Sequence, residues 1–450
     1  MKLAVVGGGG FRVPLVYGAL LRDTGTPRVE EVVLHDVSAE RLEAVAHVLA
    51  QLAAGHERPP GVRTTTDLDS ALRDADFVFS AIRVGGTAGR TADERVALDR
   101  GLLGQETTGP GGVCYGLRTI PVAMRIAERV AAVAPRAWVI NFTNPAGMIT
   151  EAMRDVLGDR VVGICDSPIG LVRRAATALG LDPARVSPGY AGLNHLGWLT
   201  GLGHRGEDVL PRLLADDEAL RRVEEARLFG ADWVRTLGAL PNEYLYYYYF
   251  TRDSIAAIEA AGRTRGELLL DQQERFYAAV RERPGDALAE WERTRRERDA
   301  TYMAETRDAA DAGERDAADL EAGGYEGIAL ALMAAISRGE PTTMILNVRN
   351  GSALPGLPAD SVVEVPCAVD ASGVRPLATR PLPGRFLGLL QQVKAVEQTT
   401  IEAARTGSAR LAVEAFALHP LVDSVTVARD LLDAYRARIP ELAAVVGGSP

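Results

Sequence analysis

The first half of the chain alternates short apolar runs with longer stretches of helical periodicity. Two helical stretches stand out, residues 14–21 and residues 39–52, and Ser38 is a suitable N-cap for the second. The apolar runs have the length and the Val, Ile and Phe content of buried strands: residues 3–6, 31–35, 76–82, 137–142 and 161–165. Strands that alternate with helices predict a parallel sheet with helices on both faces.

The pattern changes after about Pro188. We expect the middle of the chain to be helical, and the alternating acids and arginines of residues 290–318 favour a solvated helix face over a binding role. Further strands are predicted at residues 343–347 and 361–366, and further helices at residues 387–406, 409–417 and 425–438.

The fold class predicted from this pattern is α/β. We expect a Rossmann-type, doubly wound parallel sheet that binds a dinucleotide in residues 1–190. Residues 191–450 are expected to form a second, mixed α+β domain for substrate, metal and oligomer contacts.

A glycine cluster follows the first predicted strand, and an acid, Asp36, ends the second. This order is typical of dinucleotide-binding folds, because glycines let the backbone and a helix N-terminus approach a pyrophosphate. A carboxylate at Asp36 would bind ribose hydroxyls, which favours NAD over NADP. Arg12 stands where the third motif glycine is expected, so a tight turn of another α/β fold stays an alternative. The candidate cofactor residues are Gly7, Gly8, Gly9, Gly10, Phe11, Arg12 and Asp36.

Polar segments follow the later strands, at the sheet edge where ligands bind in open α/β folds. They contain Arg83, Asn144 and the pair Cys165 and Asp166. A glycine-rich segment at residues 104–112 carries Glu106, and it is interpreted as either a substrate loop or a plain surface loop.

Cys165 and His195 are candidate metal ligands, although a buried thiol and a hydrogen-bonded core histidine are the ordinary alternatives. Residues 241–250 hold five of the twelve tyrosines, which is typical of a core or an interface. A tyrosine in this segment could act as a base only if cations or a metal lowered its pKa from about 10.

The composition of the chain limits the classes of molecule that it is expected to bind. The 450 residues carry a net charge of −10, which argues against a nucleic acid. Lys2 and Lys394 are the only lysines, so anions are expected to meet arginines or backbone N–H groups. Three cysteines form no disulfide framework, and no signal peptide or membrane span is evident, so we expect a cytoplasmic protein.

Taken together, these motifs resemble glycoside hydrolase family 4, the NAD- and divalent-metal-dependent glycosidases, and especially its 6-phospho-β-glucosidases. The resemblance covers residues 3 to about 438. It rests on an ordered set of motifs: residues 7–10, 104–112, 141–146, 163–166, 192–198, 241–247, 347–351 and 363–367. It implies an architecture like that of lactate and malate dehydrogenases, with NAD+ and a divalent metal, usually Mn2+, as cofactors.

The resemblance also implies the chemistry, a redox-assisted elimination. NAD+ takes a hydride from sugar C3, the acidified C2 proton leaves, the glycosidic oxygen departs, water adds, and the hydride returns. By motif, Tyr244 is then the C2 base, and Cys165 and His195 are the metal ligands. The sugar site is implied to contain Arg83, Glu106, Asn144, Asn194 and Arg265.

The sequence does not decide between several substrates and activities. Asp166 resembles the catalytic acid of α-acting family members, whereas the overall similarity favours a β-acting enzyme on a 6-phosphorylated sugar. An α-glycosidase of the family, acting on 6-phospho-α-glucosides or α-galactosides, is the near alternative. An NAD-dependent 2-hydroxy-acid dehydrogenase and a non-enzymatic NAD sensor are the more distant ones. A homo-oligomer, dimer or tetramer, is also expected.

Overall fold

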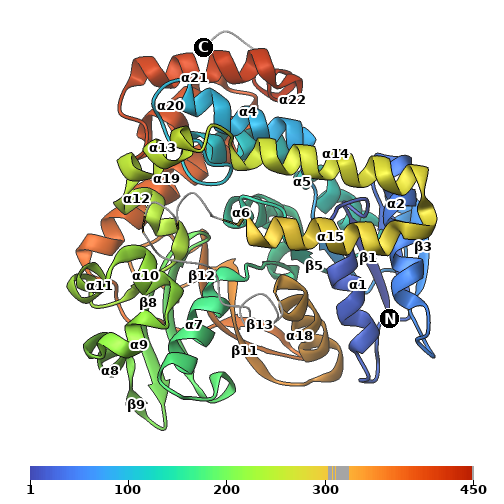
Figure 1. The fold of residues 1–450 in the computed structure, drawn as a ribbon, viewed down its shortest axis with the longest axis horizontal. Helices are drawn as coiled ribbons and strands as arrows, with labels where there is room; N and C mark the ends of the chain where they lie inside the picture. The colour runs from blue at the N-terminus through green and yellow to red at the C-terminus, as the bar shows by residue number, and fades with distance from the viewer. Residues whose placement is uncertain (303–306, 308–309, 311–323, 448–450) are drawn as a thin grey trace.

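A single twisted sheet runs through the computed structural model, which describes residues 1–302, 307, 310 and 324–447 (Figure 1). The strand order is β10-β8-β7-β12-β11-β6-β5-β4-β1-β2-β3, with β13 beside β12 and β9 beside β8. The strands are β1 Lys2–Val6, β2 Glu31–His35, β3 Gly61–Thr65, β4 Phe77–Ser80, β5 Trp138–Asn141, β6 Val161–Gly163, β7 Ser187–Leu193, β8 Leu196–His204, β9 Glu207–Asp208, β10 Leu240–Pro241, β11 Thr342–Arg349, β12 Val362–Asp370 and β13 Gly373–Pro376.

The parallel half has the Rossmann strand order, β3-β2-β1-β4-β5-β6. Its central strands are almost wholly buried, because helices cover both faces and leave no side for polar residues. This confirms the predicted fold class and the apolar runs that predicted its strands. The sequence pattern missed β3, an exposed edge strand with few apolar residues.

The antiparallel half continues the same sheet. Gly163 at the end of β6 pairs with Asn347 of β11, and β12 pairs with β7 through Glu364 and Gly192. The prediction that the chain turns helical after Pro188 was therefore wrong at its start, where β7 and β8 form a hairpin. The hairpin is rich in glycine, which disfavours strands in general but is needed here. A Cβ atom on Gly192 would lie 2.3 Å from the Cα of Gly197.

The helices cover the sheet in two layers, each with its own apolar cluster. Ser38 caps α2 as predicted, accepting the N–H of Arg41 at 3.2 Å. The helices are α1 Val13–Arg22, α2 Ala39–Ala53, α3 Leu68–Leu72, α4 Gly86–Leu98, α5 Pro110–Val133, α6 Ala146–Leu157, α7 Ser167–Ala178, α8 Leu210–Ala215, α9 Asp217–Arg221, α10 Glu224–Phe229, α11 Ala231–Leu237, α12 Tyr246–Tyr249, α13 Thr251–Ala260, α14 Arg265–Glu282, α15 Ala287–Ala300, α18 Tyr325–Arg338, α19 Gly384–Thr406, α20 Ala409–Leu418, α21 Val425–Arg438 and α22 Pro440–Val445, with short 3-10 turns η1 Gly158–Arg160, η2 Pro183–Arg185, η3 Glu243–Leu245 and η4 Pro284–Asp286.

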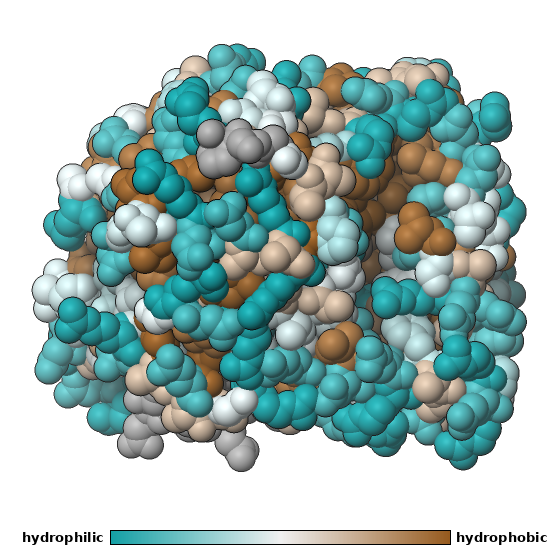
Figure 2. Space-filling model, turned by 90° about the horizontal axis from the view of Figure 1, so that it is seen from above, coloured by the Kyte–Doolittle hydropathy of each residue, from teal (hydrophilic) through white to brown (hydrophobic). Residues whose placement is uncertain are grey.

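The last four helices return to the first half of the chain. α19 and α22 pack on α5, and α21 packs on α4. On the face seen in Figure 2, hydrophilic side chains dominate and hydrophobic residues lie mainly in recesses between them. Within the described residues, none of the helices is long and apolar enough to cross a membrane. The division of the chain at residue 190 stays a prediction, and that position lies inside β7.

The charged segment at residues 290–318 is only partly a solvated helix face. Arg293 and Glu297 of α15 form the expected i,i+4 ion pair at 2.9 Å. Trp291 of the same helix is buried, however, and Arg298 lines the main cavity, so the prediction of a solvated face was wrong for these two residues. Residues 303–306, 308–309 and 311–318 lie outside the described part of the chain.

A buried ion pair joins α4 to α5. Arg118 donates to both oxygens of Asp93 at 2.7 and 2.6 Å, and neither side chain is exposed. We expect Asp93→Ala to lower the free energy of unfolding by about 3–5 kcal/mol, because the guanidinium group would stay buried without its partner. Chemical denaturation measures this. The matched control is Asp69→Ala, which removes a bidentate but exposed ion pair with Arg129. This substitution should lower the free energy of unfolding much less.

Candidate active site

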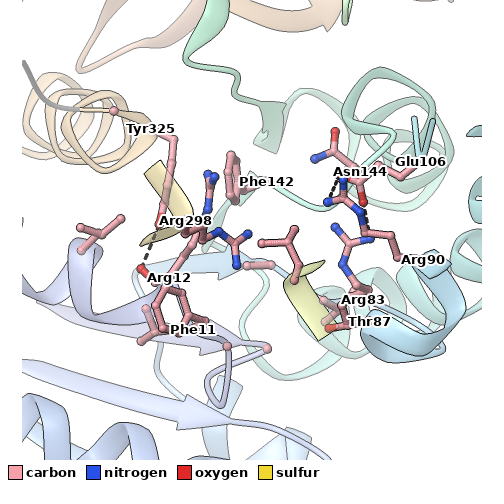
Figure 3. A pocket seen from close by; sticks show the side chains of 18 of the residues that line it. Phe11, Arg12, Arg83, Thr87, Arg90, Glu106, Phe142, Asn144, Arg298 and Tyr325 are labelled. Atoms are coloured by element: carbon pink, nitrogen blue, oxygen red, sulfur yellow. Dashed lines mark hydrogen bonds and ion pairs between the residues drawn. The ribbon is translucent and has the colours of Figure 1, made fainter. Parts of the chain in front are cut away.

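One large cavity, of about 1770 Å³, opens along the carboxyl ends of the parallel strands (Figure 3). Its walls come from the segments that follow β1, β2, β4, β5 and β6, together with the β7–β8 turn, η3, α14, α15 and α18. Ligands in open α/β sheets bind at this edge, where the strand order reverses.

The loop after β1 is a tight glycine turn. Gly7 has a φ of +91°, and a Cβ atom there would lie 2.5 Å from the carbonyl oxygen of Ala81. The N–H of Gly9 donates to the Asp36 carboxylate at 3.0 Å, which holds that carboxylate at the rim of the loop. Gly7, Gly10, Phe11, Arg12 and Asp36 line the cavity. Gly8 and Gly9 are buried, and Cβ atoms there would meet Leu34 and Arg41 at 2.7 Å.

Three aromatic side chains from distant helices hold the carbonyl groups of this loop. Tyr277 of α14 donates to the oxygen of Gly9 at 2.6 Å, and Trp291 of α15 donates to that of Phe11 at 2.8 Å. Tyr325 of α18 donates to the oxygen of Arg12 at 2.9 Å. These contacts were missed from sequence, because an aromatic residue far along the chain carries no local sign of its partner.

Glu106 lies between two arginines at the other end of the cavity. Its carboxylate is 2.5 Å from Arg83 and 2.7 Å from Arg90, which also pairs with Glu94 at 2.8 Å. Burial opposes ionisation, but the two guanidinium groups outweigh it and lower the pKa of Glu106 to about 2. Asn144 lines the cavity on the same side, as Figure 3 shows.

Two further arginines face the centre of the cavity. The guanidinium group of Arg12 lies over the rings of Phe142 and Tyr325, 5.9 and 5.4 Å from their centroids. Arg298 lies 5.5 Å from the ring centroid of Phe11, and burial together with neighbouring arginines lowers its pKa. No carboxylate of the described residues lies within 4.0 Å of either guanidinium group, so this part of the cavity favours an anion.

Arg265, predicted as a sugar contact, lines the cavity, and its guanidinium group is hydrogen-bonded to backbone carbonyl groups. It donates to the carbonyl oxygens of Thr301 and Arg298 at 3.0 and 2.8 Å. Arg265 therefore fixes the end of α15, which carries Arg298.

His195 lies at the turn of the β7–β8 hairpin with a φ of 63°. Its Nδ1 is 3.0 Å from the hydroxyl of Thr107, and that hydroxyl donates its one proton to Gln105 at 3.1 Å. With its proton on Gln105, the Thr107 oxygen accepts Nδ1–H, and this is the tautomer that leaves Nε2 without a proton. Burial also lowers the pKa of His195 to about 4, so the imidazole is neutral and Nε2 has the lone pair that a metal requires.

Cys165 lies two residues after the end of β6 and is buried in the cavity wall. Burial and the acids Glu364 and Asp166 raise the pKa of its thiol, while Ser167 hydrogen-bonds to the sulfur and lowers it. No cluster of three or more potential ligands occurs within the described residues. One thiol and one imidazole nevertheless fit a metal whose other positions are filled by substrate oxygens.

Tyr244 stacks flat on His195. The two ring centroids are 3.6 Å apart and the planes differ by 2°. The tyrosine comes from η3, and its hydroxyl lies 3.2 Å from that of Tyr302. Burial and the neighbouring Glu243 raise the pKa of Tyr244 well above its ordinary value, so it acts as a base only with help.

A buried carboxyl group, Glu364 of β12, lies behind the metal-ligand candidates. It accepts hydrogen bonds from Asn347 at 2.9 Å, Tyr190 at 3.1 Å and Asn194 at 3.4 Å. Asn194 also accepts the N–H of Ala146 at 3.2 Å. The predicted sugar contact Asn194 thus holds two walls of the cavity together and is not among its lining residues.

The fold and this cavity define a Rossmann-type protein built like a dehydrogenase. A solved malate dehydrogenase from Plasmodium falciparum shares the fold alone, with a TM-score of 0.51 and 13% identity over 90% of this chain and 99% of its own. The model described as family 4 glycosyl hydrolase matches residues 2–181, and the model of that family's C-terminal domain matches residues 190–422. The chain belongs to family 4 of the glycosyl hydrolases.

Relatives cover nearly the whole chain. A probable 6-phospho-beta-glucosidase of Bacillus subtilis is 34% identical, with 98% of both chains covered. A 6-phospho-alpha-glucosidase of Leptotrichia buccalis is 30% identical, with 96% of both covered. The solved 6-phospho-beta glucosidase of Thermotoga maritima, with manganese, NAD+ and glucose-6-phosphate, has a TM-score of 0.81 at 28% identity and covers 98% of this chain and 99% of its own. The predicted family is thus confirmed, and the predicted cofactors are those that this relative holds.

The pKa of Glu364 makes stability depend on pH. Burial raises it from 4.5 to about 7, so the unfolded chain loses this proton first as pH rises. The free energy of unfolding therefore falls between pH 4.5 and about 7. We expect Glu364→Gln, which mimics the protonated form, to flatten this fall in metal-free protein, measured by denaturation at several pH values. The exposed Glu402→Gln is the control, and an unchanged slope in Glu364→Gln would contradict the assignment.

Proposed function

We propose that this protein is a 6-phospho-β-glucosidase that uses NAD+ and a divalent metal ion, and that this metal ion is Mn2+. The observation that carries this proposal is the meeting of three groups in one cavity. These are the glycine loop ending at Asp36, the donor pair of Cys165 and His195, and the phenol of Tyr244.

The cofactors fit the residues present. Asp36 offers a carboxylate to ribose hydroxyls at the rim of the glycine loop, and Cys165 with the free Nε2 of His195 offers two ligands to a metal. When bound, NAD+ would accept and return a hydride at sugar C3 while the metal polarised the oxygen there.

The chain's own residues supply the proton transfers. Tyr244, beside the imidazole of His195, takes the proton from C2. Asp166, which follows Cys165 and lines the same cavity, gives a proton to the departing glycosidic oxygen. Water then adds at C1, with the two residues acting in reverse.

The two arginines at the centre of the cavity support a phosphorylated substrate. Arg12 and Arg298 point into the cavity, and neither pairs with a described carboxylate. A sugar phosphate would neutralise both and would bind through guanidinium hydrogen bonds. Glu106, with Arg83 and Asn144, would contact the sugar hydroxyls at the far end.

One observation favours the β-anomer as substrate, and another favours the α-anomer. Similarity to the Bacillus subtilis relative favours the β-anomer. The carboxylate of Asp166 favours the α-anomer, since it resembles the acid of α-acting family members. A 6-phospho-α-glucosidase is therefore the second candidate. The homo-oligomer, dimer or tetramer, stays a prediction.

A substrate panel tests the function. The full chain with NAD+ and Mn2+ is assayed on p-nitrophenyl α- and β-glucosides, each with and without a 6-phosphate. We expect hydrolysis of the 6-phospho-β-glucoside, no net change in NADH absorbance, and deuterium at C2 of the product formed in D2O. A product without deuterium would exclude elimination. Preference for the α-anomer would select the second candidate, and net NADH production would indicate a dehydrogenase.

Thr107 sets the protonation of the metal-binding histidine, so its hydroxyl should matter for the metal. We expect Thr107→Val to weaken Mn2+ binding by about 10–100-fold, since loss of a hydrogen-bond partner releases the orientation of a ligating imidazole. Titration calorimetry of the NAD-loaded protein measures it. Thr399→Val on α19, whose hydroxyl bonds only within its own helix in the described contacts, is the control. Equal Mn2+ affinity in the two variants would rule out this role.

A further inference from the structure

A chain of hydrogen bonds leads from Tyr244 to a buried carboxylate. The hydroxyl oxygens of Tyr244 and Tyr302 are 3.2 Å apart, and Tyr302 Oη is 2.9 Å from Oε1 of Glu243. The hydroxyl of Ser167 donates to the same Oε1 at 3.0 Å. Glu243 is 6% exposed. The chain thus begins at the base expected from the family motif and ends at a group that can accept a proton.

The geometry sets the direction of every proton in this chain. A phenol has one proton, and Tyr302 donates its proton to Glu243. Tyr302 can therefore only accept from Tyr244, whose O–H points along the chain toward the carboxylate. The lone pairs of the Tyr244 oxygen are then free to accept a proton from the cavity.

Two structural features hold the chain in this arrangement. The side chain of Asn242 accepts the N–H of Tyr244 at 3.1 Å and so caps η3, which carries Glu243 and Tyr244 together. The flat stack of Tyr244 on His195 fixes the plane of the phenol ring. Tyr302 follows α15, so the relay joins the same helix that presents Arg298 to the cavity.

We propose that Tyr302 and Glu243 are positioning residues that orient Tyr244 and carry away its proton during C2 deprotonation. This inference rests on the proposed function. As the C2–H bond breaks, its proton goes to Tyr244 Oη and its electron pair stays on the sugar as the enolate of the C3 ketone. The phenolic proton of Tyr244 moves to Tyr302, and that of Tyr302 moves to Glu243, which becomes a carboxylic acid. The same transfers run backward when C2 is protonated again.

The relay avoids the formation of a phenolate at Tyr244. A free phenolate at Tyr244 would lie in the cavity wall, joined through Tyr302 to the carboxylate of Glu243, and both burial and a second negative charge disfavour it. If the protons move together, no phenolate forms. The negative charge passes from Glu243 to the enolate of the sugar.

The experiment compares Tyr302→Phe and Glu243→Gln with the unchanged protein. Both variants keep the shape of the side chain and remove its ability to carry a proton. Tyr248→Phe, in the same tyrosine segment but outside the cavity lining, is the matched control. Each full chain is loaded with NAD+ and Mn2+ and given the p-nitrophenyl 6-phosphoglucoside of the preferred anomer, labelled with deuterium at C2 or at C3.

We expect both relay variants to lower kcat at least about 10-fold, within the roughly 10²–10⁴-fold range of general acid–base catalysis. The kinetic isotope effect of C2 deuterium should rise and that of C3 deuterium should fall toward one, because deprotonation becomes the slow step. NAD+ affinity, measured by fluorescence titration, should be unchanged in both variants, and Tyr248→Phe should match the unchanged protein throughout.

Four outcomes would overturn the relay, one of them together with the proposed function. Full activity in both variants would show that neither residue carries the proton. Lower activity with both isotope effects unchanged would show a merely structural role. If the unchanged protein exchanged no deuterium into C2 from D2O, the proposed function would fail together with the relay, whereas C2 exchange that persists at the full rate in both variants overturns the relay alone.

Discussion

The site depends on one buried carboxyl group, Glu364, at the joint between the parallel and antiparallel halves of the sheet. Its oxygens accept side-chain hydrogen bonds from β11, from β7 and from the β7–β8 turn. The strands meet closely here because Gly163 and Gly192 lack side chains. A Cβ on Gly163 would lie 2.8 Å from that of Asn347. This joint brings Cys165, after β6, and His195, after β7, to the same cavity although β6 and β7 are not neighbours in the sheet.

The charges of the cavity follow a second constraint, the near absence of lysine. Arginine keeps its charge when buried. Its planar guanidinium group can donate hydrogen bonds to carboxylates from its edge and stack on an aromatic ring with its face, so several arginines can be accommodated in one low-dielectric cavity. Glu106 and Glu94 together neutralise Arg83 and Arg90, and aromatic faces support others, as in the contact of Arg12 with Tyr325. The cavity therefore has a nearly neutral end for sugar hydroxyls and a cationic centre for an anion.

Local patterns predicted the parts of the molecule that are determined locally. The buried parallel strands, the Ser38 cap, helices α19 to α21 and those motif residues that line the cavity all depend on short stretches of sequence. The β7–β8 hairpin was missed because its glycines, needed for close approach, resemble a loop. Tyr277, Trp291 and Arg298 were missed because they reach the cavity from the charged helices α14 and α15, and Tyr325 was missed because it begins the apolar helix α18. Their contacts with the cavity arise only from the tertiary fold.

The stack of Tyr244 on His195 links the two halves of the proposed chemistry. A metal bound at Nε2 would hold the imidazole plane, and that plane supports the phenol ring at 3.6 Å. The other side of the imidazole is held by Thr107, in the same segment as Glu106. The residues proposed as sugar contact, metal ligand and base therefore lie next to one another, since the segment of Glu106 holds His195 and His195 supports Tyr244. The three groups come from motifs that lie far apart in the chain and form one packed unit in the fold.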